Sequence, residues 1–378
     1  MIWSAVVGIA IIVVVLWEAF ETVVLPRRVS RRFRLTVLYY RTTWSVWRAV
    51  SRWIGKRARR ESFLSFYGPL SLLMLFVVWA LAIIAGFGFV YHSAALAGGI
   101  DSRLPPLFYM SGTTMFTLGL GDVVPHTSVE RVLAVAESGL GFGFLALVLS
   151  YLPVIYQAFS RREVSIVLLD ARAGSPPTAA ELLRRHVGAD GARALEQLLH
   201  EWERAAADIL ESHISYPVLC YFRSQHNNES WLGALVAILD TCTILLADQT
   251  GPLARQARLT FAICRHTVVD LAQVFYAVPE KAGERLPATD FERLRALLAP
   301  TEFQLRDAPE PVAKMGKLRE MYEPYVQGLA RGLAIDVPSW ILPREAADNW
   351  KTSAWGRITS SSRTTATGRD VVPDAHAD

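Results

Sequence analysis

Residues 114–125, TMFTLGLGDVVP, form the stretch of the chain whose residue types could do chemistry. Gly119 and Gly121 alternate with leucines between Thr117 and Asp122. Glycine reaches positive φ angles without steric cost, so such an alternation can point successive backbone carbonyls to one side. A column of carbonyl oxygens, together with the Thr117 hydroxyl, can replace the water shell of a bare cation. The stretch therefore predicts a backbone that coordinates a cation.

The segments around this stretch are apolar enough to lie in a membrane. Of the 378 residues, 52% are hydrophobic, and roughly 20 consecutive apolar residues cross a bilayer core. We expect membrane spans at residues 2–25, 70–91 and 132–154. Positive charges follow the first apolar run instead of preceding it, which argues against a signal peptide and for an N-terminus outside.

Residues 26–67 carry twelve Arg or Lys against Glu61 alone, a balance of +11 in a chain whose net charge is +4. Because this block lies between two apolar spans, we interpret it as a cytoplasmic loop that faces anionic lipid headgroups, and not as a nucleic-acid site. Within it, residues 33–54 predict a helix in the membrane interface with arginines on one face: Arg34, Arg41, Arg48 and Arg52. A voltage sensor is the alternative, but the arginine spacing disfavours it.

A short helix should precede the glycine stretch. Pro105 and Pro106 can occupy a first helical turn, and residues 107–116 are too few to span a bilayer. This pattern is typical of a re-entrant helix followed by irregular backbone. Such backbone persists at membrane depth only where protein buries it or where it lines a water-filled path.

The stretch TTMFTLGLGDVVP resembles the pore loop of the potassium channel superfamily, and the order of outer helix, pore helix, filter and inner helix extends the resemblance over residues 68–158. The resemblance implies that the ion-facing carbonyls, which would bind K⁺, belong to Thr117, Leu118, Gly119 and Leu120. It implies that Gly121 closes the outer mouth and that Asp122 lies behind it. One pore loop cannot surround an ion, so we expect a homotetramer.

Two residues depart from the family pattern. Leu120 stands where an aromatic residue is usual, and Phe116 stands where a second threonine is common. We expect Phe108, Tyr109 and Met110 of the pore helix to offer a smaller apolar cuff around the filter. A monovalent cation channel with weak K⁺ over Na⁺ discrimination is therefore the alternative to a potassium-selective one.

The inner helix contains several residues with candidate roles. Gly141 could be a gating hinge or a close-packing position, and Pro153 could kink the helix near a gate. Glu137 could support the filter by bonding Thr113 or Thr114, or it could face the cavity. We take Glu137, Thr113 and Tyr109 as filter-support residues.

From residue 159 onward the periodicity becomes helical and predicts a compact cytoplasmic domain. Two capping boxes are expected, Thr178 with Glu181 and Thr289 with Glu292. The predicted helices cover residues 178–187, 191–214, 229–248, 252–278, 289–299 and 311–334. Charged residues interrupt the two most apolar of these, which favours core helices over further spans.

Residues 221–230, YFRSQHNNES, crowd polar groups between two apolar helices. They could form a regulatory site for an unknown ligand, or a buried polar network in which Asn228 or Ser230 caps the next helix. The candidate ligand residues are Arg223, Gln225, His226, Asn227 and Asn228. No dinucleotide-binding, EF-hand or phosphate-loop motif is present, and no organic cofactor is expected.

The sequence thus predicts an all-α membrane protein with a potassium-channel-type pore, an extra N-terminal transmembrane helix and an α-helical cytoplasmic domain, and not an enzyme. The expected parts are residues 1–26, 27–67, 68–158, 159–348 and a disordered tail at 349–378. The expected location is a bacterial inner membrane with the C-terminal domain in the cytoplasm. A membrane-anchored sensor with a non-conducting pore is the alternative from another class.

Overall fold

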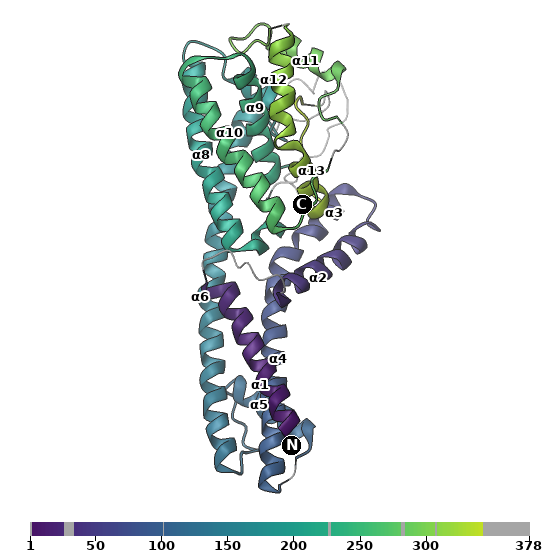
Figure 1. The fold of residues 1–378 in the computed structure, drawn as a ribbon, viewed down its shortest axis with the longest axis vertical. Helices are drawn as coiled ribbons and strands as arrows, with labels where there is room; N and C mark the ends of the chain where they lie inside the picture. The colour runs from purple at the N-terminus through teal and green to yellow at the C-terminus, as the bar shows by residue number, and fades with distance from the viewer. Residues whose placement is uncertain are drawn as a thin grey trace, which may run out of the picture. The chain divides into compact units, whose positions relative to one another are not determined.

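The computed structural model describes residues 2–25, 34–100, 102–225, 228–280, 284–306 and 308–342. In these ranges every regular element is a helix, so the predicted all-α class is confirmed (Figure 1). The expected disordered tail and the cluster of arginines at residues 27–32 lie outside the described residues.

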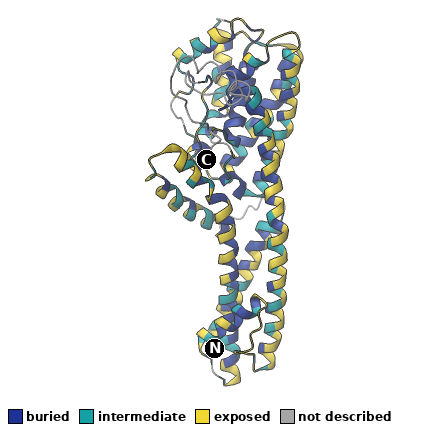
Figure 2. Ribbon diagram, turned by 180° about the vertical axis from the view of Figure 1, so that it is seen from behind, coloured by how far each residue is buried: buried dark blue, intermediate teal, exposed yellow. Residues whose placement is uncertain are grey.

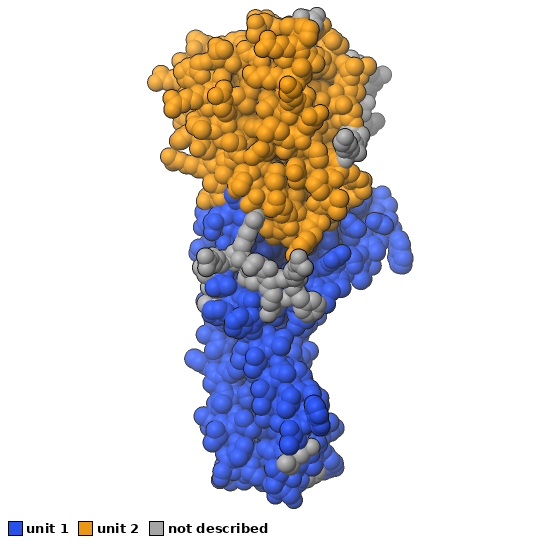
Figure 3. All heavy atoms as spheres, viewed as in Figure 1, with its two compact units in different colours: residues 1–161, 209–223 blue, residues 162–208, 224–378 orange. Residues whose placement is uncertain are grey.

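The chain divides into two compact units (Figure 3). The first unit holds residues 1–161 and 209–223, and the second holds residues 162–208 and 224–378. The division lies close to the predicted boundary at residue 159. Residues 209–223, which we expected in the helical domain, group with the first unit.

Two apolar helices build the centre of the first unit. α1 (Ile2–Ala19), prolonged by the π-helical turn η1 (Phe20–Val24), packs along α4 (Tyr67–Gly98). A Cβ atom on Gly8 would lie 2.4 Å from the carbonyl oxygen of Gly86, so glycine lets the two backbones approach closely. Small residues at such contacts are typical of packing between membrane helices.

The predicted interfacial helix is α2 (Leu35–Ser51), followed by α3 (Arg57–Ser65). The Glu18 carboxylate of α1 accepts hydrogen bonds from the amides of Leu35 and Thr36 at 3.2 and 3.0 Å, so it caps the start of α2. Aromatic contacts of Trp44 with Tyr67 and Tyr221 fix the other side of α2. The 3₁₀ turn η2 (Pro217–Tyr221) supplies the latter ring.

The short helix α5 (Leu104–Met115) begins with prolines in its first turn, as predicted, and packs against α4. The long helix α6 (Ser128–Ala173) contains the third expected span and carries residues of both units. α8 (Gly191–Ser215) likewise carries residues of both. Figure 2 shows α6, the long helix at its right edge, as largely exposed along the first unit.

The second unit is built around α9 (Trp231–Asp248). It also contains α7 (Ala179–Arg185), α10 (Gly251–Val274), α11 (Ala288–Leu298), α12 (Pro309–Glu320) and α13 (Glu323–Leu333). Four helical segments are long and apolar enough to cross a membrane, namely Ile2–Val23, Arg57–Gly98, Ser128–Ala173 and α9. Since 94% of α9 is buried inside its own unit, it has no face left for lipid and is a core helix, as predicted.

Two local predictions in this unit are wrong. Residues 311–334 form two helices, because Tyr322 leaves the helical conformation and Pro324 lies in the first turn of α13. The expected capping box at Thr289 is absent, since α11 starts one residue earlier, after Pro287. The box at Thr178 is half confirmed: its hydroxyl accepts from the Glu181 amide, while the Glu181 carboxylate pairs with arginines.

Candidate functional site

The glycine stretch has an alternating backbone. Thr117, Gly119 and Gly121 have φ angles of +58°, +57° and +81°, whereas Leu118 and Leu120 have negative φ. Alternation between left-handed and ordinary residues turns successive peptide carbonyls toward one side of the strand. This is the conformation that the glycine spacing predicted, and it suits the coordination of a cation by backbone oxygens.

Thr117 holds this conformation without being glycine. A threonine in the left-handed region is strained by about 1–2 kcal/mol. The end of α5 supports it, because the Thr117 amide donates to the Thr114 carbonyl at 3.0 Å. The Thr113 carbonyl accepts from Leu118 and Gly119 at 2.8 and 3.4 Å. Thr113 therefore contacts the glycine stretch, as expected, but through its backbone carbonyl.

A hydrogen-bonded cap fixes the other end of the loop. Glu130, in the first turn of α6, accepts from the amides of His126 and Thr127 at 2.8 and 3.0 Å. The Thr127 hydroxyl accepts from the Glu130 amide at 3.2 Å. This reciprocal pair is a capping box. The loop is thus held between the last turn of α5 and the first turn of α6.

The side chains of the glycine stretch are open in a single chain. Leu118 and Leu120 are 62% and 63% exposed. A Cβ atom placed on Gly119 or Gly121 would meet nothing within 4 Å. A single chain therefore covers only one side of the glycine stretch and leaves the other side exposed.

The pore helix does not form the expected cuff within this chain. Phe108 packs edge-on against Phe89 of α4 with ring centroids 5.4 Å apart, and Met110 is buried in the core. Tyr109 is 41% exposed, and its hydroxyl lies close to the Asp122 carboxylate. The pore helix therefore lies beside the outer end of the glycine stretch at this position.

Glu137 of α6 is fully buried, and its partners differ from those expected. Its carboxylate accepts from the Ser111 hydroxyl at 2.5 Å and from the Tyr91 hydroxyl at 2.8 Å. It is not bonded to Thr113 or Thr114, since the Thr113 hydroxyl donates to the Met110 carbonyl. Spacing along α5 could not distinguish these positions, because Ser111 and Thr114 lie one turn apart on the same face. Glu137 therefore joins α4, α5 and α6.

Gly141 of α6 lies against the end of the pore helix. An added Cβ would lie 2.0 Å from the Met115 carbonyl oxygen, so no larger residue fits without moving α5 or α6. The close-packing role is thus observed, while the hinge role stays a prediction. Pro153 lies inside α6, which continues as a helix to Ala173.

The candidate regulatory residues do not converge on one another where they are described. In the first unit, Arg223 pairs with Glu61 of α3 at 3.7 Å. In the second unit, the Gln225 amide donates to the Glu163 carboxylate of α6 at 3.2 Å. Each of these groups therefore has a structural partner of its own.

The remainder of the same loop starts α9. The Ser230 hydroxyl accepts from the Gly233 amide at 2.9 Å, so Ser230 is the helix cap and the Asn228 alternative is wrong. Asn228 is exposed, and His226 and Asn227 lie outside the described residues. A regulatory site in this loop stays a prediction.

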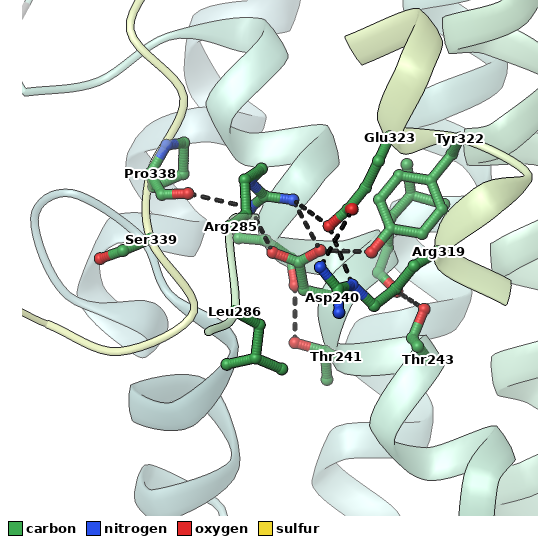
Figure 4. Close-up of polar contacts among 12 residues, drawn as sticks. Asp240, Thr241, Thr243, Arg285, Leu286, Arg319, Tyr322, Glu323, Pro338 and Ser339 are labelled. Atoms are coloured by element: carbon green, nitrogen blue, oxygen red, sulfur yellow. Dashed lines mark hydrogen bonds and ion pairs between the residues drawn. The ribbon is translucent and has the colours of Figure 1, made fainter. Parts of the chain in front are cut away.

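A buried ionic network that the sequence did not predict lies in the second unit (Figure 4). Asp240 of α9 forms a bidentate pair with Arg285 at 2.7 and 3.3 Å and accepts from the Tyr322 hydroxyl at 2.5 Å. Arg285 also donates to the Pro338 carbonyl at 2.9 Å. Burial opposes the charge of Arg285, but Asp240 outweighs it and the pKa of Arg285 is raised. The network joins α9 to the segment that follows α13.

The described residues show little that could serve catalysis. They contain no group of three His, Cys, Asp or Glu side chains placed to hold a metal ion. Cys220, Cys242 and Cys264 are buried, as predicted, and burial raises the pKa of the latter two thiols. Buried protonated thiols are poor nucleophiles.

Comparisons with known proteins agree with this site. Residues 75–157 match a family described as ion channel. An uncharacterized membrane protein of Bacillus subtilis, YdjJ, is 26% identical over 203 residues, or 51% of this chain and 58% of that protein. The matched region thus spans little more than half the length of that relative. No solved structure matches the chain.

These findings confirm the resemblance to pore-loop channels over the segment that carries it. Residues 75–157 cover most of α4, all of α5, the glycine stretch and the first part of α6. The protein is a membrane protein with a channel-type pore domain.

Proposed function

We propose that the protein is a potassium channel in which four copies place residues 117–121 around a shared path for K⁺. The single observation that carries this proposal is the alternating φ pattern of Thr117, Gly119 and Gly121. It directs the carbonyls of Thr117, Leu118, Gly119 and Leu120 to one side, where oxygens from four chains replace the hydration shell of K⁺. The open side of the loop in a single chain is the side that the other copies cover.

Leu120 decides between two forms of this function. Its side chain is aliphatic and 63% exposed, so it cannot form the aromatic cuff that usually limits the diameter of such a loop. A weakly selective monovalent cation channel is therefore the second candidate. The proximity of the Tyr109 hydroxyl to the Asp122 carboxylate favours the selective form, because a hydrogen bond between them would oppose widening at the outer end.

The inner helix and the second unit gate the channel in this proposal. α6 contains both Pro153 and the residues that begin the second unit, so a movement of that unit acts directly on the helix behind the filter. Gly141 and Pro153 are the positions at which α6 would bend. A ligand of the second unit would then regulate conduction.

The basic helix α2 is proposed to lie on the anionic inner surface of a bacterial inner membrane, with the N-terminus outside. Leu38, Val46 and Arg41 are exposed on α2, and Arg52 and Trp53 are exposed just after its end. Such a helix places its apolar side among acyl chains and its arginines among phosphates.

The experiment that tests the function is ion flux through the purified protein in liposomes, under a K⁺ gradient and then a Na⁺ gradient. Barium block and Gly119→Ala are the controls, because a side chain at φ +57° should disrupt the carbonyl column. K⁺ flux that both controls abolish would establish the channel. Comparable Na⁺ flux that Leu120→Tyr suppresses would favour the weakly selective form.

A non-conducting sensor predicts a different result. It shows no flux of either ion in the full chain or after removal of residues 160–378, which takes away the second unit that would hold α6 closed. That pair of results would overturn the channel proposal.

A further inference from the structure

α9 is a core helix whose composition would also suit a membrane span. It has 18 residues, which is near the lower limit for crossing a bilayer core. Among the four described segments that are long and apolar enough to cross a membrane, it has the lowest mean hydropathy. One charged residue can keep so marginal a segment out of a bilayer, because a central aspartate opposes insertion as strongly as several leucines favour it.

Asp240 is this charged residue. It is the tenth residue of α9 and the only charged one before the last position of the helix. The hydroxyls of Thr241 and Thr243 donate to backbone carbonyls one turn earlier in α9, at 2.7 and 2.8 Å, so they need no partner outside the helix. Asp240, in contrast, depends on Arg285 and Tyr322, which lie outside α9 (Figure 4). The Asp240 carboxylate is therefore the main barrier to insertion of α9.

The partners of Asp240 are made after α9. Arg285 and Tyr322 lie 45 and 82 positions later in the chain, and α10, α12 and α13, which pack against α9, also follow it. At about 5–20 residues per second, Arg285 is added about 2–9 s after Asp240. During this interval α9 has no finished core to bury it, and the bilayer is the competing apolar environment.

We propose that Asp240 is a topology determinant, whose charge keeps α9 out of the bilayer until the second unit has folded around it. Arg285 then pairs with the carboxylate, which would be costly to bury alone. An additional span at α9 would place the residues that follow it on the opposite side of the membrane. Replacing Asp240 by leucine changes the insertion equilibrium of α9 by about two orders of magnitude. The proposal concerns membrane insertion alone and does not rest on ion conduction.

Thiol labelling of the full-length protein in intact cells tests this role. Alanine replaces the native residues Cys220, Cys242 and Cys264, and Leu259→Cys supplies a reporter thiol on α10, where Leu259 is 49% exposed. A membrane-impermeant maleimide is applied before and after the cells are permeabilised. We expect Asp240→Leu to increase the fraction of chains with the reporter on the side opposite to the parental one by about tenfold or more. The measured quantity is a change of side, so either orientation of the parent can be used.

Two further variants separate the charge from the stability of the second unit. Arg285→Met removes the partner in the folded core but keeps the Asp240 charge, so the reporter should stay on the parental side although the core is destabilised. Val236→Asp, added to Asp240→Leu, restores a charge one turn away and should return the reporter to the parental side.

The outcomes decide the role of Asp240 without any measurement of ion flux. A reporter that stays on the parental side in Asp240→Leu would overturn the proposal. A change of side in Arg285→Met as large as in Asp240→Leu would also overturn it, because instability and not charge would then be the cause. A change of side confined to Asp240→Leu would support it even if the protein conducted no ion.

Discussion

Glu137 in the first unit and Asp240 in the second are both buried acidic residues in the middle of apolar helices, yet their surroundings differ. Glu137 is held by two hydroxyl groups, from Ser111 and Tyr91. Asp240 is held by a bidentate guanidinium and a phenol. Removing a carboxylate that is bonded by neutral donors costs a modest amount of stability, because only hydroxyl groups lose their partner. Removing one member of a buried ion pair costs more, because the other charge stays buried without its partner.

The largest expected effect is the loss of the buried pair. Asp240→Asn keeps the shape of the side chain but removes the bidentate partner of Arg285, which is 8% exposed and keeps only Glu323 at 3.2 Å as a counter-charge. We expect a loss of about 3–5 kcal/mol in unfolding free energy, because Glu323, which is 19% exposed, compensates this buried charge only in part. Chemical denaturation of the purified protein measures it. If adding Arg285→Met restored none of the lost stability, charge burial would not be the cause.

A smaller loss is expected at the hydroxyl-bonded carboxylate. Glu137→Leu deprives the Ser111 and Tyr91 hydroxyls of their acceptor, which should cost about 2–4 kcal/mol. Glu137→Gln keeps a carbonyl acceptor and should recover more than half of that loss. The thermal midpoint in detergent measures both variants. Equal midpoints for Leu and Gln would show that these hydrogen bonds do not support the unit.

Glu229 is a third acidic residue, which is partly buried, and its neighbours are the carboxyl groups of Asp170 and Glu163. Burial first, and then Asp170, raises the pKa of Glu229 from 4.5 to about 8. The folded chain keeps this proton between those two pH values while the unfolded chain releases it, so stability is complete below about pH 4.5 and falls as the pH rises to about 8. Because Glu229 is partly exposed, the fall should be on the order of 1–2 kcal/mol.

Denaturation at several pH values measures this fall, and Glu229→Gln should flatten the profile above pH 4.5. The control is Glu181→Gln. Burial raises the pKa of Glu181, but Arg184 and Arg185 lower it by more, and the pKa falls to about 2. Its stabilising contribution is therefore lost only as the pH falls from about 4.5 toward 2. An unchanged slope in Glu229→Gln would contradict the assignment.

The smallest effect is expected for an ion pair with one exposed partner. Arg306 is 71% exposed and Asp248 is 5% exposed, so water screens the interaction from the side of the arginine. Asp248→Asn should cost less than about 1 kcal/mol in the denaturation assay used for Asp240→Asn. A cost as large as that of Asp240→Asn would remove the contrast between buried and exposed pairs.

Local patterns in the sequence predicted the elements better than the contacts. The proline pair before residue 107 and the alternation of Gly119 and Gly121 specify a helix start and a backbone conformation, because each depends on neighbouring residues. The partners of Glu137 and Asp240 lie 26 to 82 positions away and could not be read from spacing. The Glu18 cap on α2 escaped prediction for the same reason.

The prediction of one site in the polar loop at residues 221–230 relied on residues that are adjacent in sequence but have separate partners. Its polar residues are adjacent in sequence, which suggested one site, but Arg223 and Gln225 bond different helices in different units. Composition identifies polar residues, whereas the direction of each side chain depends on the tertiary structure.

The contact at Gly141 gives α6 the mechanics of a lever. The helix touches the end of α5 there, which makes Gly141 a fulcrum beside the filter loop. The arm from Ser128 to Gly141 is about 20 Å long, and the arm from Gly141 to Arg161, the last residue of α6 in the first unit, is about 30 Å. A tilt of about 10° would move the near end by about 3 Å and the far end by about 5 Å. A force at the far end would therefore act with about 1.5-fold mechanical advantage on the segment that leads to the glycine stretch.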